Sequence, residues 1–325
     1  MFLSKWRVVH WVSLLAAGVL LIFIGPFATA RAAEPSLTIG YVPVLGLSPA
    51  LLARSLGIYA KEQLNVRLVS FSSGPALYQA MAGGRVEMAY AGVPALLEWG
   101  SRGLQVKAVA KVEDGTFDLI ERKGYSGPLR GASIGDVGQG SGQDVMLRGF
   151  LLPARHVPLN SVSIRYLPQS DMLGALASKQ LDMALLGAPL TTIGELKGDR
   201  LVAAVPDPGF ILLARQSFIH SQPKVVAAVI RAHQLAIAYL KSHPKRAADL
   251  LAKDLSVPSV STPGGGTVTA AAVVASGLKT LHFSATFTAS DFRLYQQMNQ
   301  RLVQLGLIRH AQNVRRYFDL KWVGK

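Results

Sequence analysis

Two short segments rich in serine and glycine carry the residue types best suited to holding a small anion. Ser72-Ser73-Gly74-Pro75 and Gln139-Gly140-Ser141-Gly142 each stand where a predicted strand gives way to a predicted helix. The first turn of a helix offers unpaired N–H groups and a partial positive charge, which suits a carboxylate, sulfonate, phosphate or nitrate. Serine is also a favoured helix cap, so ordinary capping stays open for each segment. Their matched placement in two similar halves of the chain favours ligand contact.

Two segments that contain glycine and proline are predicted to end strands beside the same site. Gly92-Val93-Pro94 and Gly187-Ala188-Pro189 each follow an apolar, strand-like run. Glycine permits unusual backbone angles and proline stiffens a turn, so each segment suits either a ligand-contacting edge or a simple turn. The site residues predicted from these four segments are Ser72, Ser73, Gly74, Gly92, Val93, Pro94, Gln139, Gly140, Ser141, Gly187 and Pro189.

The residue patterns of most catalytic and cofactor sites are missing. The third glycine of a dinucleotide-binding G-x-G-x-x-G pattern would fall at Gln143, and no G-x-x-x-x-G-K-[ST] phosphate loop occurs. The seven histidines form no i,i+3 or i,i+4 pair, which argues against a metal site or a Ser-His-Asp relay. Cysteine is absent, so disulfides and thiol catalysis are excluded. We therefore predict no enzymatic activity, no cofactor and no metal.

The elements that position these segments form an internal repeat with a constant offset of 95 residues. Residues 80–94 match residues 175–189 at six identical positions. The same offset places residues 39–42 on residues 134–137, and residues 67–71 on residues 162–166. Three ungapped blocks at one offset indicate a duplicated architecture.

Each half of the repeat reads as strand, helix, strand, helix, strand, which specifies a mostly parallel α/β sheet. Ligands of such sheets bind beyond the carboxyl ends of the strands. The predicted strands are residues 37–42, 66–71, 86–91, 132–137, 162–167 and 181–186. The predicted helices are residues 49–56, a helix that opens at residues 73–75 and ends at Gly83, and residues 143–152 and 170–178.

Two similar α/β lobes with a ligand cleft between them follow from this repeat. We predict that residues 34–122 and 211–325 form one discontinuous lobe and that residues 123–210 form the other. The crossings between lobes are expected within residues 117–128 and 202–213. C-terminal helices that start near Ser221-Gln222-Pro223, near Thr267 and at Thr288 would return to the first lobe as core and scaffold.

The first 33 residues are predicted to be a cleaved secretory signal peptide. Lys5 and Arg7 precede an apolar stretch from Val8 to Phe27, and the small residues at positions 28–33 offer cleavage sites. A run of about 20 apolar residues could instead remain as a membrane anchor. In that alternative, the two-lobe domain would be a ligand-sensing module.

The charge balance favours an anionic partner. The net charge is +15, and it becomes +12 without residues 1–33, which contain Lys5, Arg7 and Arg31 but no acid. Such a surface attracts anionic solutes or an anionic membrane face. The basic residues are spread out, and apart from the group Lys241, Lys245 and Arg246 and the pair Arg315-Arg316 they form no cluster with interleaved aromatics, so we predict no nucleic-acid binding.

The order of these motifs resembles the aliphatic-sulfonate, taurine and nitrate group of periplasmic binding proteins of ABC importers. The resemblance runs from about Ser36 to Phe318 and includes Leu37-Thr38-Ile39-Gly40-Tyr41-Val42, Phe71-Ser72-Ser73-Gly74-Pro75, residues 80–89, Gly92-Val93-Pro94-Ala95 and residues 129–135. It implies the type II periplasmic binding protein fold and an extracytoplasmic protein that delivers a small-molecule solute to a membrane permease and its ATPase. It implies no catalysis, and we expect a monomer.

The same resemblance assigns individual residues to the cleft. It places there Val44, Ser73, Gly74, Gly92, Pro94 and Ser141. Pro189 matches in part, because relatives often carry an aromatic or acidic residue beside this proline, where the chain has Ala188 and Leu190. The identity of the solute therefore stays open. Pyrimidine synthases of the same superfamily rely on a cysteine-rich motif, which the chain lacks.

Overall fold

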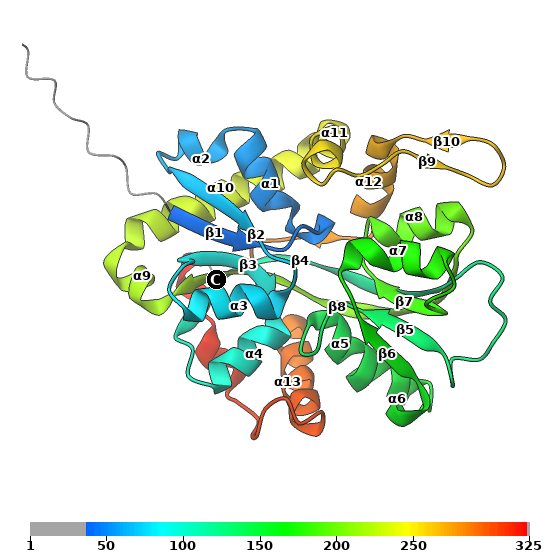
Figure 1. The fold of residues 1–325 in the computed structure, drawn as a ribbon. Coiled ribbons are helices and arrows are strands. Elements are labelled where there is room, and N and C mark those ends of the chain that lie inside the picture. Colours follow the sequence, from blue (N-terminus) through cyan, green and yellow to red (C-terminus); the bar gives the residue numbers. More distant parts are fainter. Residues whose placement is uncertain (1–36, 324–325) are drawn as a thin grey trace, which may run out of the picture. The chain divides into compact units, whose positions relative to one another are not determined.

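A nine-stranded mixed sheet forms the centre of the computed structural model, which describes residues 37–323 (Figure 1). The strands are β1 (Leu37–Tyr41), β2 (Val66–Ser70), β3 (Met88–Gly92), β4 (Val106–Glu121), β5 (Ser133–Asp136), β6 (Ser163–Tyr166), β7 (Met183–Leu186), β8 (Arg200–Arg215) and β11 (His282–Phe283). Their order is β2-β1-β3-β8-β4-β7-β5-β6, with β11 paired to β4. The predicted signal peptide lies outside the described residues.

Helices cover the sheet and follow most of its strands. The helices before β8 are α1 (Ser48–Ser55), α2 (Ile58–Lys61), α3 (Gly74–Ala82), α4 (Val93–Ser101), α5 (Gly142–Met146), α6 (Leu152–Ala154), α7 (Gln169–Ala177) and α8 (Leu190–Lys197). The helices after β8 are α9 (Gln216–Ser221), α10 (Pro223–Ser242), α11 (Pro244–Asp254), α12 (Ala270–Leu278) and α13 (Ala289–Gln304). Strands β9 (Val260–Ser261) and β10 (Thr267–Val268) form a separate antiparallel hairpin.

The predicted duplication is present in the sheet. Strands β2, β1 and β3 pair in parallel at one end of the sheet, and β6, β5 and β7 pair in parallel at the other. Helix α7 spans Gln169–Ala177, at the offset of 95 residues from α3 at Gly74–Ala82. The long strands β4 and β8 share nearly the same offset and pair antiparallel in the middle.

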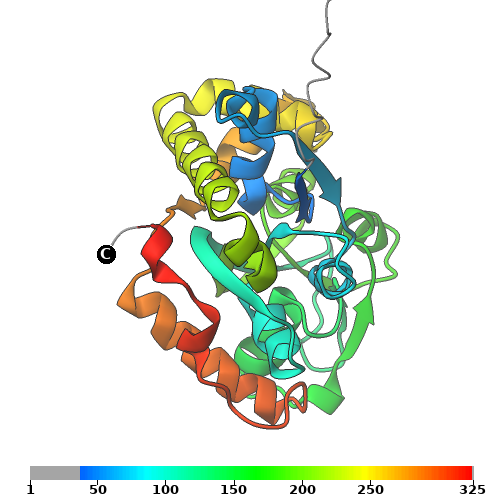
Figure 2. The ribbon, with the colours of Figure 1, turned by 90° about the vertical axis from the view of Figure 1, so that its left-hand side faces the viewer.

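Apolar layers on both faces hold the first half of the sheet. Helices α1, α10 and α11 cover one face, around buried residues such as Leu51 and Ile230. Helices α3, α4 and α13 cover the opposite face, around residues such as Leu77 and Met298 (Figure 2). Each fully buried aliphatic side chain contributes roughly 1.5–3 kcal/mol, so this packing stabilises the fold without disulfides.

The pairing of β4 with β8 is irregular in its centre. Its register shifts between Lys111 and Glu113 and again between Glu113 and Gly115. Opposite these shifts, Gly209 has a φ of +83°, and a Cβ atom there would lie 2.1 Å from the carbonyl oxygen of Glu113. Only glycine fits this position. These two strands join the parallel halves of the sheet, because β8 pairs with β3 of the first half and β4 pairs with β7 of the second.

Several predicted elements differ from the observed ones. Gly92-Val93-Pro94 is not a turn, because α4 begins at Val93 directly after β3, and Gly92 has an ordinary φ of −81°. Gly187-Ala188-Pro189, by contrast, does form a turn, at Ala188 and Pro189, before α8 begins at Leu190. Thr267 lies in β10, and α12 starts at Ala270 with Thr269 as its cap.

Other expectations are confirmed. Thr288 and Asp291 form the predicted capping box of α13. The predicted helix over residues 143–152 exists, with a π-helical stretch at Leu147–Leu151 between α5 and α6. The predicted lobe boundaries stay a prediction.

Candidate functional site

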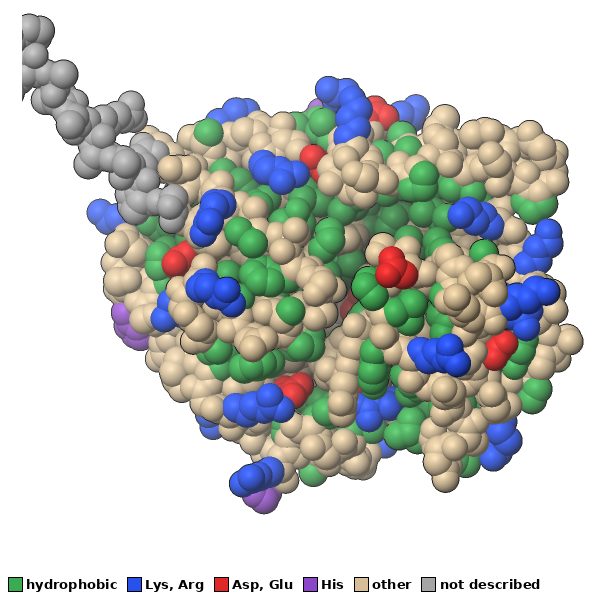
Figure 3. All heavy atoms as spheres, in the orientation of Figure 1, with side chains coloured by type: hydrophobic (Ala, Val, Ile, Leu, Met, Phe, Trp, Pro, Cys, Tyr) green, Lys and Arg blue, Asp and Glu red, His purple; other side chains and the backbone are tan. Residues whose placement is uncertain are grey.

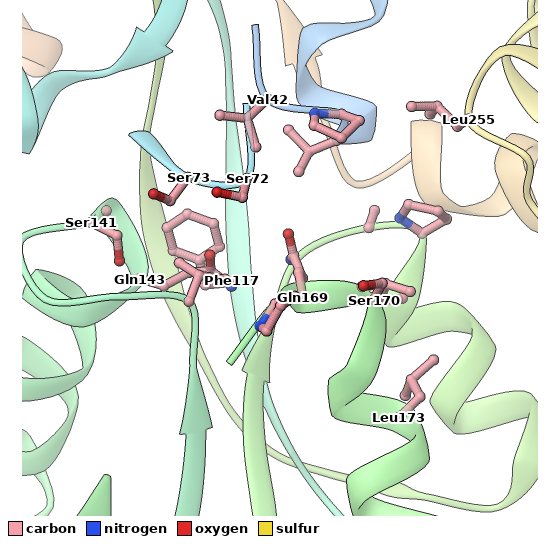
Figure 4. Close-up of a pocket in the computed structure, with 18 of the residues that line it drawn as sticks. Val42, Ser72, Ser73, Phe117, Ser141, Gln143, Gln169, Ser170, Leu173 and Leu255 are labelled. Atoms are coloured by element: carbon pink, nitrogen blue, oxygen red, sulfur yellow. The ribbon is translucent and has the colours of Figure 1, made fainter. Parts of the chain in front are cut away.

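A cavity of about 660 Å³ lies beyond the carboxyl ends of the parallel strands (Figure 4). Loops from both repeats line it, namely residues 42–44 after β1, 72–74 after β2, 92 and 95 after β3, 137 and 141–143 after β5, 168–170 after β6, and 188–190 after β7. Phe117 of β4 and Phe210 of β8 also line it. The space-filling view shows the surface hollowed near the middle of this face, with hydrophobic side chains around much of the hollow (Figure 3).

Hydroxyl groups gather at one end of the cavity, which we call the serine end and define as Ser72, Ser73 and Ser141 (Figure 4). Ser73 caps α3 by accepting a hydrogen bond from the amide of Ala76 at 3.4 Å. Ser141 caps α5 by accepting one from the amide of Asp144 at 3.1 Å. Both serines therefore cap helices and line the cavity at once.

Ser73 and Ser141 are not equivalent positions of the repeat, contrary to the matched placement predicted from the sequence. Ser73 precedes α3, whose counterpart is α7, so the residue at the offset of 95 is Pro168. Ser141 follows β5, whose counterpart is β1, so its equivalent is Gly46. The two loops meet because the repeats face each other across the cleft.

The cavity brings together seven of the predicted site residues, which are Val44, Ser72, Ser73, Gly74, Gly92, Ser141 and Pro189. Five others do not line it. Val93 and Pro94 are buried in the first turn of α4. Gln139 is exposed, and Gly140 packs so close to Glu98 that a Cβ atom would lie 2.4 Å from its Oε2. Gly187 lies beside the ring of Phe117.

Sequence reasoning missed part of the lining. Applying the offset of 95 to residues 73–75 would have pointed to residues 168–170, of which Gln169 and Ser170 contribute polar groups. Gln143 also lines the cavity, and its amide donates to the carbonyl of Leu185 at 2.8 Å. Residues 255–258, which follow α11, had no signal in the sequence because they belong to neither repeat.

A buried carboxyl group stands behind the serine end. Asp136 ends β5, and its Oδ1 accepts hydrogen bonds from the amide of Gly138 at 3.3 Å and the hydroxyl of Ser141 at 3.4 Å. Its Oδ2 has no hydrogen-bond partner among the described residues. Burial, and then the charge of Asp144, raise the pKa of Asp136 to about 8. The protonated form therefore predominates at neutral pH, which removes a negative charge from this end of the cavity.

Hydrogen bonds from neighbouring groups hold the carboxylate of Asp144 behind the same end of the cavity. Arg148 donates to it at 2.7 and 2.5 Å, the hydroxyl of Tyr166 at 2.7 Å, and the amide of Gly140 at 2.9 Å. Among residues 37–323, Lys197 is the one ionisable side chain that lines the cavity, and it is exposed. Apart from the exposed ammonium of Lys197, the cavity wall therefore consists of hydroxyl, amide, backbone and apolar groups.

Residues 37–323 lack the features of a metal centre and of a membrane span. No three His, Asp or Glu side chains gather there in a way that could hold a metal ion. None of the helices in this range is both long and apolar enough to cross a membrane.

Sequence comparisons relate the chain to a known family. The profile of the NMT1-like family matches residues 30–256. A protein of Brucella abortus (strain 2308) that carries the name "Putative binding protein" is 30% identical over 233 residues, covering 67% of the chain and 71% of that protein.

Solved structures share the fold. The alkanesulfonate-binding protein SsuA of Xanthomonas axonopodis pv. citri, bound to MOPS, has a TM-score of 0.74 at 20% identity, covering 89% of the chain and 100% of SsuA. The periplasmic nitrate-binding protein NrtA of Synechocystis PCC 6803 has a TM-score of 0.65 at 14% identity, covering 86% of the chain and 84% of NrtA. The predicted periplasmic binding protein fold is thus confirmed.

Proposed function

The chain belongs to the NMT1-like family and has the fold of SsuA- and NrtA-type solute-binding proteins, and we propose that it captures a small anionic or zwitterionic solute. The family and the fold are those of binding proteins rather than enzymes. The observation that carries the proposal is the cavity of about 660 Å³ at the carboxyl ends of six parallel strands, lined by loops from both repeats.

An anionic group is favoured at the serine end. In the first turn of α3 the amides of Ala76 and Leu77 are bonded to Ser73 and Pro75 has no N–H, which leaves the amide of Gly74 as a donor beside the hydroxyls of Ser72 and Ser73. Ser141 faces them from the other repeat. No Asp or Glu of residues 37–323 lines the cavity, and Asp136 behind it is mostly protonated at neutral pH. We assign solute contact to the predicted residues that line the cavity, namely Val44, Ser72, Ser73, Gly74, Gly92, Ser141 and Pro189.

Capture would proceed by closure of two lobes around the solute. Strands β4 and β8 continue from one end of the sheet to the other, so bending of this pair would bring the loops of the two repeats together. The lobes of this proposal are residues 34–122 with 211–325, and residues 123–210.

Delivery to an ABC permease with its ATPase completes the proposed role. The protein would act as a free monomer outside the cytoplasm after removal of residues 1–33. Sequencing the N-terminus of the exported protein tests this: a start near Arg31–Glu34 supports a free binding protein. A retained Met1 or Phe2 would favour the anchored sensing module instead.

A thermal-shift screen tests the binding function. A solute that binds the folded state raises its stability by RT ln(1 + [L]/Kd), so the melting temperature should rise with solute concentration. The screen uses sulfonates, nitrate, carboxylates, amino acids and pyrimidines, and product analysis of each positive should show the solute unchanged. The proposal fails if no compound shifts the melting temperature, or if the bound compound is converted.

A further inference from the structure

After α11 the chain crosses from one side of the cleft to the other. Helix α11 packs with α1 in the core of the first half, whereas β9, a few residues later, packs against α8 of the second repeat. We call residues 255–268 the strap. Figure 1 shows its β9-β10 hairpin reaching over α8. The strap follows the second repeat and has no counterpart in the duplication.

Apolar contacts hold the strap on the second half. Val260 of the strap and Val273 of α12 are buried against Ile193 of α8. Val257 packs on the same cluster, as do Leu173 and Leu190. The position of the strap over the cleft is thus defined by side-chain packing on both sides of the molecule.

The first four residues of the strap, residues 255–258, form a wall of the cavity. Leu173, Leu190 and Ile193 of α7 and α8 line it as well. Figure 4 shows Leu173 and Leu255 away from the hydroxyls of Ser72, Ser73 and Ser141, with the ring of Phe117 on the side of the serines. This strap end of the cavity is therefore mainly apolar, with Ser170, Ser256 and the exposed Lys197 of α8 as its polar side chains.

The strap end is a poor environment for a small, strongly hydrated anion. Leaving water costs a charged group several kcal/mol unless fixed charges or hydrogen bonds replace its hydration. Only the serine end supplies such groups in number; the described lining holds no guanidinium group, and its one ammonium group, that of Lys197, is exposed to solvent. The cavity of about 660 Å³ is also in the range of about 300–1,000 Å³ that buries organic molecules of drug size.

We propose that the strap forms an apolar subsite, so that the solute is amphipathic, with one anionic or zwitterionic group at the serine end and an apolar chain or ring against Leu173, Leu255 and Val257. This inference rests on the proposed solute-binding function. It makes Leu255 and Val257 specificity-determining residues, because they contact the apolar body and leave the charged group untouched.

Two series of probes with constant head groups test the subsite. The sulfonates run from methanesulfonate to octanesulfonate and the carboxylates from acetate to octanoate, with nitrate and bicarbonate as anions without an apolar body. Isothermal titration of the full chain measures each Kd. Affinity should rise about fourfold for each methylene group that becomes buried, and nitrate and bicarbonate should bind weakest.

Substitutions in the strap should separate the affinity for the head group from the affinity for the apolar body. Leu255→Ser and Val257→Ser should weaken octanesulfonate or octanoate about tenfold and change methanesulfonate or acetate less than twofold. Leu250→Ser is the matched control, since Leu250 is a half-buried leucine of α11 that does not line the cavity. It should leave all affinities unchanged.

A substitution on α7 keeps the test valid if the strap variants fold poorly. Gly174 lines the cavity, and a Cβ atom there would meet no other atom within 4 Å. Gly174→Leu should therefore fill the strap end without lowering the melting temperature, and it should weaken only the long-chain probes. Equal affinity for short and long probes, or equal loss of both in Gly174→Leu, would overturn the subsite while solute binding stands. Absence of binding by every probe, with no shift in the wider screen, would overturn both.

Discussion

The serine end and the strap end of the cleft are built in different ways. At the serine end, backbone N–H groups and hydroxyls arise where strands pass into helices, and the duplicated α/β plan produces such junctions in both repeats. At the strap end, residues 255–258 come from a segment outside the repeat, held by packing on α8. The duplicated scaffold thus supplies a site for many kinds of polar head group. The added segment restricts which molecular body can be attached to that head group.

Blocking the serine end should have the largest effect and should not discriminate among solutes. Gly74 lines the cavity in the first turn of α3, and a Cβ atom there meets no atom within 4 Å. We expect Gly74→Val to weaken short and long probes alike by about 100-fold, because it occupies the space of the shared head group. Isothermal titration of short and long probes into Gly74→Val and, in parallel, into Gly174→Leu checks this. Selective loss of long probes in Gly74→Val would reverse the assignment of the two ends.

Removing single hydroxyls at the serine end should distinguish capping from solute contact. Ser73→Ala and Ser141→Ala should each lower the free energy of unfolding by about 1 kcal/mol, since each loses a helix cap. Each should also weaken probes of every length about tenfold. Ser72→Ala is the control, because Ser72 lines the cavity without capping a helix, so its stability should be unchanged. Reduced stability with full affinity in the first two variants would leave the serines as caps only.

A change of pH should alter the stability of the fold and the affinity for the anionic head group through Asp136, which lies behind the serine end. It should leave the contacts of the strap end unchanged. Asp136 has a pKa of about 8 in the folded protein, well above its ordinary value of 3.8. Below the ordinary value both states are protonated. Between about 4 and 8 the unfolded chain is ionised and the folded chain is not, so stability should fall as pH rises through this window and level off above it.

The variant Asp136→Asn isolates this effect. Its free energy of unfolding should lack the share of the pH dependence that Asp136 contributes, measured by urea denaturation at pH 5, 7 and 9. In the wild type, anion affinity should drop severalfold above pH 8, because the ionised carboxylate lies next to Ser141. Equal pH profiles in the two proteins would show that Asp136 is not the group responsible.

Relaxing the strap backbone should have the smallest effect. Ser256 has a φ of +51°, in the left-handed region that costs a non-glycine residue about 1–2 kcal/mol. Because glycine loses more backbone entropy on folding, we expect Ser256→Gly to stabilise the fold by only about 0.5 kcal/mol. Affinities should change less than twofold if Leu255 and Val257 carry the subsite. A large loss of affinity for short probes would instead assign Ser256 to the head group.

The sequence alone predicted six of the nine strands of the sheet, the parallel α/β plan of its two halves and the repeat, because apolar periodicity and self-similarity are local or additive signals. It did not predict the long central strands β4 and β8 or the short β11. Six cavity residues were found because strand-to-helix junctions are recognisable from glycine, serine and proline, and a seventh, Val44, followed from the family resemblance. Sequence reasoning misjudged Val93 and Pro94, whose glycine- and proline-bearing segment looks like a turn and in fact opens α4. A proline fits the first turn of a helix as well as a turn, so composition could not separate the two.

Tertiary structure alone decided how the junctions combine. Ser73 and Ser141 occupy different positions of the repeat, and only the antiparallel pairing of β4 with β8 turns them toward one cavity. Likewise, nothing in the types of Leu255 and Val257 distinguishes them from other core residues. They line the cleft because α11 packs on one half of the molecule and β9 on the other. Contacts between residues far apart in the chain depend on packing of the whole, which a local pattern does not encode.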